Sequence, residues 1–224
     1  MTELLLPIAS EIISAGLAFV LVYFFFRAYR LTKLAYLLGL PFGFSFLGVS
    51  YISLGVSMIY ERSSVSSIGS LWLYLVTQTY GFAFVTISYY FSRKMEEKAK
   101  HILKIVSLAS AISIFLILLG LYLAPPSLGL PSNDVADEGF RIANLVFLVY
   151  VIYTLVKNWE SSRRPISRSM WASSAFSLLA IGQYSQLIHD IDGSQTAFIF
   201  AHILRIASLL VLIYIYYVSG KGEG

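Results

Sequence analysis

Long apolar runs separated by short polar links make up most of this 224-residue chain. A helix needs about 20 mostly apolar residues to cross the hydrocarbon core of a bilayer. Seven stretches meet this requirement, and they predict an all-α bundle of seven transmembrane helices that forms one domain over residues 1–224. The predicted spans are residues 4–26, 34–60, 68–91, 105–123, 140–156, 170–187 and 196–218.

The second apolar stretch contains Pro41 between Gly39 and Gly43. Proline removes a backbone hydrogen-bond donor and its ring crowds the preceding turn of a helix. We therefore expect the second span to be kinked near its start.

The composition supports a membrane location. Hydrophobic residues make up 58% of the chain, charged residues only 12%, and the mean hydropathy is +0.76. A soluble domain carries roughly a quarter charged residues. We therefore predict a multi-pass protein of the cell membrane. No basic segment precedes the first apolar run, so we expect that run to remain as a span rather than to be removed as a signal peptide.

Basic residues predict the orientation. The first, third and fifth links, within residues 27–33, 92–104 and 157–169, hold twelve of the sixteen Lys and Arg residues. The positive-inside rule places these links in the cytoplasm, with the N-terminus outside and the C-terminus inside. Topology and anionic lipid headgroups account for this distribution, so we expect no nucleic-acid partner. The same loops are candidates for contact with a cytoplasmic or membrane protein partner.

One basic residue, Arg205, falls within a predicted span. An arginine at the centre of a span costs about 2.5–3.5 kcal/mol on insertion scales, so it normally faces the bundle interior or a partner. Glu11 is the carboxylate well inside a span, at a similar depth. We predict that Glu11 and Arg205 form an ion pair between neighbouring first and seventh helices. The pair could fix the helix register, face a ligand or relay protons.

Other polar residues recur at spacings of three or four in the outer halves of the spans, which places the members of each group on one helix face. These groups are Arg141 with Asn144, Gln183 with Gln186 and Asp190, and His202 with Arg205. Single polar residues often only join helices by hydrogen bonds, but so many at one depth predict an outward-opening polar cavity. The candidate ligand-binding residues are Glu11, Gln78, Gln183, Gln186, His202 and Arg205.

Residue types restrict the cofactors and the chemistry. A covalent retinal needs a lysine inside the bundle, and each lysine lies in a predicted cytoplasmic link, at a cytoplasmic span edge or in the C-terminal tail. Covalent retinal is therefore excluded, whereas a b-type haem between His189 and His202 stays an alternative. We expect no metal site, because Asp190-Ile191-Asp192 is typical of a solvated turn. The chain also lacks cysteine and the common catalytic motifs, so we expect no enzyme.

Two segments carry a resemblance to a known family. The run Gln78-Thr-Tyr-Gly-Phe-Ala-Phe-Val-Thr-Ile-Ser-Tyr-Tyr-Phe91, the segment Ala201-His-Ile-Leu-Arg205 and the order of spans resemble the seven-helix sensory regions of some prokaryotic histidine kinases and of related stand-alone archaeal membrane proteins. The resemblance implies a sensory or receptor-like module for a small or lipid ligand. It transfers no functional residue, and because no kinase domain is present, signalling would need a partner.

Two other functions stay open. The chain could be a non-catalytic or haem-bearing subunit of a membrane complex. It could also be a proton-coupled transporter, because a set of Glu, Arg and His side chains within the membrane can relay protons.

Overall fold

The computed structural model describes residues 2–60, 66–91, 96–123, 133–161 and 168–221. These residues form seven α-helices and one short 3-10 helix, which confirms the all-α prediction. In chain order the elements are α1 (Thr2–Thr32), η1 (Ala35–Leu38), α2 (Gly39–Tyr60), α3 (Ser66–Phe91), α4 (Glu96–Leu123), α5 (Asn133–Ser161), α6 (Arg168–Asp192) and α7 (Gln195–Lys221).

Four helical stretches are long and apolar enough to cross a membrane, judged by length and composition. They are Leu6–Thr32, Tyr36–Ile59, Asp137–Glu160 and Gln195–Val218. The outward faces of the helices are apolar as well, with Ile12, Val146 and Ile203 each more than half exposed. Such a surface is expected where the surroundings are lipid rather than water.

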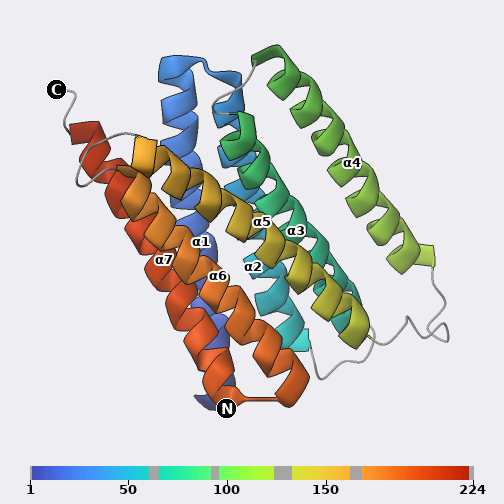
Figure 1. Ribbon diagram of the computed structural model, residues 1–224. Coiled ribbons are helices and arrows are strands. Elements are labelled where there is room, and N and C mark those ends of the chain that lie inside the picture. Colours follow the sequence, from blue (N-terminus) through green and yellow to red (C-terminus); the bar gives the residue numbers. More distant parts are fainter. Residues whose placement is uncertain (1, 61–65, 92–95, 124–132, 162–167, 222–224) are drawn as a thin grey trace.

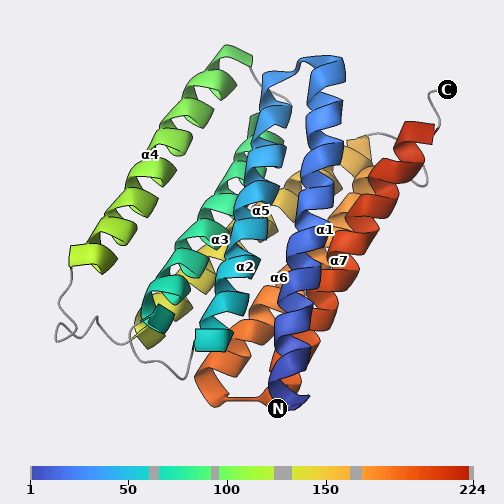
Figure 2. The same cartoon turned by 180° about the vertical axis from the view of Figure 1, so that it is seen from behind.

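Six of the helices form a closed ring in the order α1, α2, α3, α5, α6 and α7, with α7 packed against α1. The predicted adjacency of the first and seventh helices is therefore confirmed. The helix α4 lies outside this ring at one edge of the molecule, where it contacts α3 and η1 (Figures 1 and 2). The N-terminus and the α6–α7 link lie at one end of the bundle, and the α1–α2 link and the C-terminus lie at the other (Figure 1).

The predicted second span is interrupted close to Pro41. The 3-10 helix η1 ends at Leu38 and α2 begins at Gly39, so Pro41 lies in the first turn of α2. The first turn tolerates proline because its backbone N–H groups have no partner within the helix. The break therefore precedes the proline, and α2 itself continues from there to Tyr60.

Two helices end in residues with left-handed backbone conformation. Lys33 (φ 58°) follows α1 and donates its N–H to the Tyr29 carbonyl at 2.7 Å, and Gly193 (φ 71°) follows α6 and bonds the His189 carbonyl at 2.8 Å. Both bonds satisfy carbonyl groups at the helix end. In the same link Ser194 N–H donates to Asp192 at 2.9 Å. The prediction of a solvated turn at Asp190-Ile191-Asp192 is wrong, because these residues form the last turn of α6 and Asp190 pairs with Arg141.

Some helices extend past the predicted spans. The helix α5 begins at Asn133, before the predicted start at residue 140, and α4 begins at Glu96 rather than at residue 105. Both additional segments contain charged residues, which a search for apolar runs excludes. Charged residues are nevertheless common at the end of a helix where it extends beyond the hydrocarbon region.

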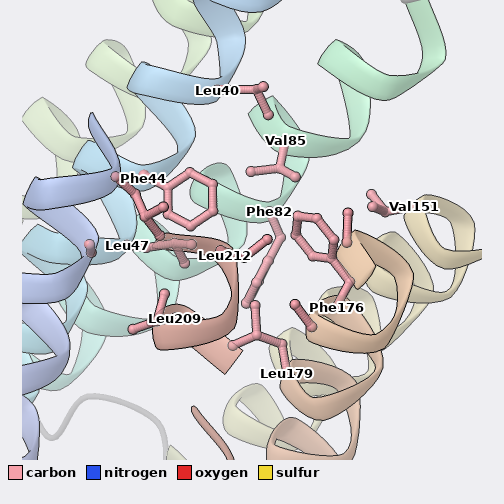
Figure 3. Close-up of a cluster of buried hydrophobic side chains, with 14 of the residues drawn as sticks. Leu40, Phe44, Leu47, Phe82, Val85, Val151, Phe176, Leu179, Leu209 and Leu212 are labelled. Atoms are coloured by element: carbon pink, nitrogen blue, oxygen red, sulfur yellow. The ribbon is translucent and has the colours of Figure 1, made fainter. Parts of the chain in front are cut away.

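Large apolar side chains fill the half of the ring that is nearest the C-terminus (Figure 3). Phe44 from α2, Phe82 from α3 and Phe176 from α6 are each no more than 1% exposed, and Leu209 and Leu212 from α7 complete the contact. Side chains from different helices thus interlock in this half of the bundle. The buried charged, amide and imidazole side chains gather in the other half, toward the N-terminus.

Helices α2 and α3 pass very close to each other at two glycines. A Cβ atom on Gly43 would lie 2.8 Å from the Gly81 carbonyl oxygen, and one on Gly81 would lie 3.0 Å from the Gly43 carbonyl oxygen. Larger residues would push the backbones apart, as expected for small-residue contacts between membrane helices.

Candidate functional site

A buried ion pair joins α1 to α7. Arg205 Nη2 lies 2.5 Å from Glu11 Oε1, and the two residues are 3% and 0% exposed. The sequence prediction of this pair is confirmed. Because α1 and α7 run in the same direction from the same end of the bundle, Glu11, nine residues after the first residue of α1, and Arg205, ten residues after the first residue of α7, reach the same depth.

His202 belongs to the same cluster, one turn from Arg205. The Arg205 Nη2 group donates a hydrogen bond to His202 Nδ1, and Glu11 Oε1 lies 3.2 Å from the same nitrogen. A guanidinium has no acceptor, so Nδ1 accepts and the imidazole proton is on Nε2. Ser10 Oγ, at 3.0 Å from Nδ1, adds a further contact from α1. The predicted common face of His202 and Arg205 is confirmed.

The helix α2 covers this cluster with an aromatic ring. The guanidinium carbon of Arg205 lies 4.5 Å from the centre of the Tyr51 ring, which is fully buried. This cation–π contact stabilises the positive charge without using any of its N–H groups. A Cβ on Gly55 would lie 3.4 Å from Glu11 Cβ, so α2 passes close to the carboxylate too.

A hydrogen bond between two amide side chains connects α3 to α5. Asn144 Nδ2 donates to Gln78 Oε1 at 3.1 Å, and both residues are fully buried. On α6, Gln183 and Gln186 are 3% and 5% exposed. The ring therefore encloses all of the predicted ligand-binding residues. We define the polar layer as Glu11, Tyr51, Gln78, Asn144, Gln183, Gln186, His202 and Arg205.

A second ion cluster, which we name the Arg141 clamp, lies on α5, α6 and α3. Arg141 Nε donates to Asp190, Nη2 lies 3.5 Å from Asp137, and Nη1 donates to the Tyr74 hydroxyl at 3.1 Å. The sequence placed Arg141 and Asp190 on inward helix faces but did not pair them. The pair was predictable in principle, because Arg141 and Asp190 carry opposite charges near the outer ends of consecutive predicted spans.

Several atoms of the polar layer have no hydrogen-bond partner among the described residues. The donors among them belong to Arg205, His202 and Gln78, and the acceptors belong to Glu11, Gln183 and Asn144. The atoms are Arg205 Nε and Nη1, His202 Nε2, Gln78 Nε2, Glu11 Oε2, Gln183 Oε1, Asn144 Oδ1 and the Tyr51 hydroxyl. Buried polar atoms are normally paired with protein, water or a ligand. The polar layer therefore has both unused hydrogen-bond donors and unused acceptors.

The predicted outward opening of this site is not present in this conformation. Glu11, Gln78 and His202 are at most 4% exposed, so the polar layer is closed. A ligand from outside would reach it only after a movement of helices or side chains.

The two histidines proposed as haem ligands both contact one phenylalanine. The Phe198 ring centre is 4.8 Å from the His189 ring and 4.3 Å from the His202 ring. A haem with two axial imidazoles needs them to face each other across its plane. This conformation does not fit that arrangement, because Phe198 packs against both imidazoles.

We found no matching family model, curated protein or solved structure for this chain. The resemblance to kinase sensory regions therefore stays a prediction.

Proposed function

We propose that this chain is a seven-span membrane protein that acts as a sensory or receptor-like module. The polar layer binds a small ligand from the outside, and the cytoplasmic loops pass the change to a protein partner. The direction of the helices supports this orientation, because they alternate along the chain (Figure 2), so that basic residues at the ends of α1 and α5 fall at the same end of the bundle. Arg30, Lys33 and Lys157 belong to that end, which also holds the C-terminus.

The observation that carries the proposal is the unpaired binding capacity of a deeply buried arginine. Only Nη2 of Arg205 bonds to the described protein groups, whereas Nε and Nη1 have no partner. Leaving a buried donor unpaired costs about 1–3 kcal/mol, and more when it is charged. A purely structural ion pair with Glu11 would not need these additional N–H groups, nor the open amide groups beside them.

The composition of the polar layer explains how binding could be transmitted. Each helix of the ring contributes at least one of its residues, so a ligand there would bias the packing of all six helices. The interlocked apolar core (Figure 3) fills the half of the ring between this layer and the proposed cytoplasmic end. Packed cores respond to small displacements by shifting between discrete arrangements, which can move the loops that a partner contacts. Residues 27–33, 92–104 and 157–169 are the candidate contact loops.

The experiment is thermal unfolding of the purified protein in mild detergent with a panel of polar metabolites and lipids. A true ligand at 100 times its Kd adds about 2.7 kcal/mol to the stability. We expect this gain to vanish in Arg205→Gln and to persist in Asp190→Asn, which alters the Arg141 clamp only. Equal stabilisation of the Arg205→Gln variant would refute the site.

A proton-coupled transporter is the second candidate, and the contact of His202 with Glu11 at 3.2 Å favours it. Adjacent titratable groups within a membrane can pass a proton between them. Proton flux into liposomes that is lost in Glu11→Gln would support this function. Absence of flux in the wild-type protein under a pH gradient and a membrane potential would exclude it.

A further inference from the structure

We propose that the ligand of the polar layer is a small zwitterion of the α-amino acid type. Its carboxylate would bind Arg205 and its ammonium group would bind Glu11. This inference rests on the proposed function, since it names the class of molecule that the same site takes.

The two buried arginines differ in their remaining capacity. Arg141 contacts two carboxylates, Asp190 and Asp137, and a phenol hydroxyl. Arg205 contacts one carboxylate, and its Nε and Nη1 groups have no partner among the described residues. A guanidinium carries five N–H donors and pairs most strongly with carboxylate oxygens. Arg205 is therefore the cation that can take another carboxylate, whereas Arg141 is the structural clamp.

The negative partner of Arg205 also has free capacity. Glu11 uses Oε1 for Arg205, but its Oε2 atom has no partner, although the residue is fully buried. The open Gln183 Oε1 atom is on α6, which passes close to Arg205: a Cβ on the adjacent Gly182 would lie 3.8 Å from Arg205 N. An ammonium group has three donors and no acceptor, so it matches such oxygen atoms.

Charge balance selects among ligand classes. Glu11 and Arg205 cancel, and His202 is neutral because its Nδ1 accepts a hydrogen bond. An added anion or cation would leave a net buried charge, which is costly in a low-dielectric interior. An uncharged ligand avoids that cost but forms only one-sided charge-assisted bonds, which are weaker than pairs of opposite charges. A zwitterion adds no net charge and gives both charged residues an opposite partner.

The contact between the two protein charges limits the size of the ligand. Glu11 and Arg205 touch at 2.5 Å, so the ammonium and carboxylate groups that they bind must also be close together. An α-amino acid carries both groups on one carbon atom. A zwitterion whose charges are separated by a long chain does not match this geometry.

The test is a series of four compounds made from one small amino acid. They are the free amino acid, its N-acetyl derivative (an anion), its amide (a cation) and its N-acetyl amide (uncharged). Thermal unfolding of the wild-type protein gives an apparent affinity for each, after the common amino acids have been screened to choose the parent. We expect stabilisation by the zwitterion and a loss of about tenfold or more in affinity for each derivative, as expected when a bond to a charged group is lost.

Variants of the protein then show which residue binds the carboxylate of the ligand and which binds its ammonium group. Arg205→Gln should remove the preference for a free carboxylate, Glu11→Gln should remove the preference for a free ammonium group, and Asp190→Asn should retain both. Equal stabilisation by the N-acetyl or the uncharged derivative in the wild-type protein would overturn the proposal, and this result does not depend on the variants folding. Stabilisation by another compound class alone, lost in Arg205→Gln, would overturn the zwitterion while the proposed function stands. No stabilisation by any compound would overturn both.

Discussion

Removing one partner of the Glu11–Arg205 pair should destabilise the protein far more than removing both. Each residue is at most 3% exposed and each is the other's only charged partner of opposite sign within contact distance among the described residues. Breaking a buried pair leaves an uncompensated charge, which costs about 3–5 kcal/mol. We therefore expect Glu11→Gln and Arg205→Met each to lose about that much.

The double variant removes both charges together. Replacement of a complete buried ion pair by groups of similar volume is often close to neutral. We expect Glu11→Gln/Arg205→Met to cost less than either single change, which corresponds to a coupling energy of at least about 3 kcal/mol. A matched control is Arg30→Met, because Arg30 is exposed and contacts only the Phe26 ring among the described residues, at 4.6 Å. That change should cost no more than about 1 kcal/mol.

The assay is reversible unfolding in mixed micelles by titration with a denaturing detergent, followed by helical circular dichroism. It gives a free energy of unfolding for the wild-type protein, the two single variants, the double variant and the control. Strictly additive single effects, or single effects no larger than that of Arg30→Met, would refute the pairing of Glu11 with Arg205. The polar layer would then lack the ion pair at its centre.

Three further predictions follow from the packing and the orientation. Gly81→Ala should lose about 1–3 kcal/mol of stability in the same assay, because the added Cβ would lie 3.0 Å from a backbone oxygen of α2. The control Gly16→Ala, whose Cβ would have no atom within 4 Å, should be neutral or slightly stabilising. Equal effects of the two changes would contradict the close approach of α2 and α3. Arg141→Met should cost about 3–5 kcal/mol but Asp190→Asn only about 1 kcal/mol, because a second carboxylate still contacts the guanidinium; similar costs would mean that the clamp depends on one pair. The chain has no cysteine, so a cysteine introduced by Leu31→Cys would be its single thiol. Leu31 is 74% exposed beside the α1–α2 link, and the new thiol should react with a membrane-impermeant maleimide only after the cells are permeabilised. Labelling of intact cells would reverse the proposed orientation.

Much of the local structure could be predicted from the sequence. Apolar runs of about twenty residues indicate helices because each backbone polar group must be paired within a spanning segment. The Glu11–Arg205 pair was predictable for a related reason, since opposite charges within apolar spans need each other. The same spacing rule placed His202 on the face of Arg205.

The arrangement of the helices was harder to predict from the sequence. Nothing in the apolar pattern of α4 distinguishes it from the ring helices, because lipid-facing and helix-facing residues are similarly apolar in membrane proteins. The Arg141–Asp190 pair was missed because both residues lie near predicted span ends, where an exposed charge is ordinary. The closed state of the polar layer also depends on side-chain packing across six helices, which a single sequence does not specify.

The most direct test of the central claim is native mass spectrometry of the protein extracted from its own membranes in mild detergent. If the polar layer is a ligand site, the wild-type protein and Arg30→Met should each carry the same small-molecule mass, and Arg205→Gln should show the mass of the chain alone. A bare wild-type chain that also gains no mass from any compound of the metabolite panel would contradict a ligand site. The same adduct on Arg205→Gln would place the ligand elsewhere on the protein.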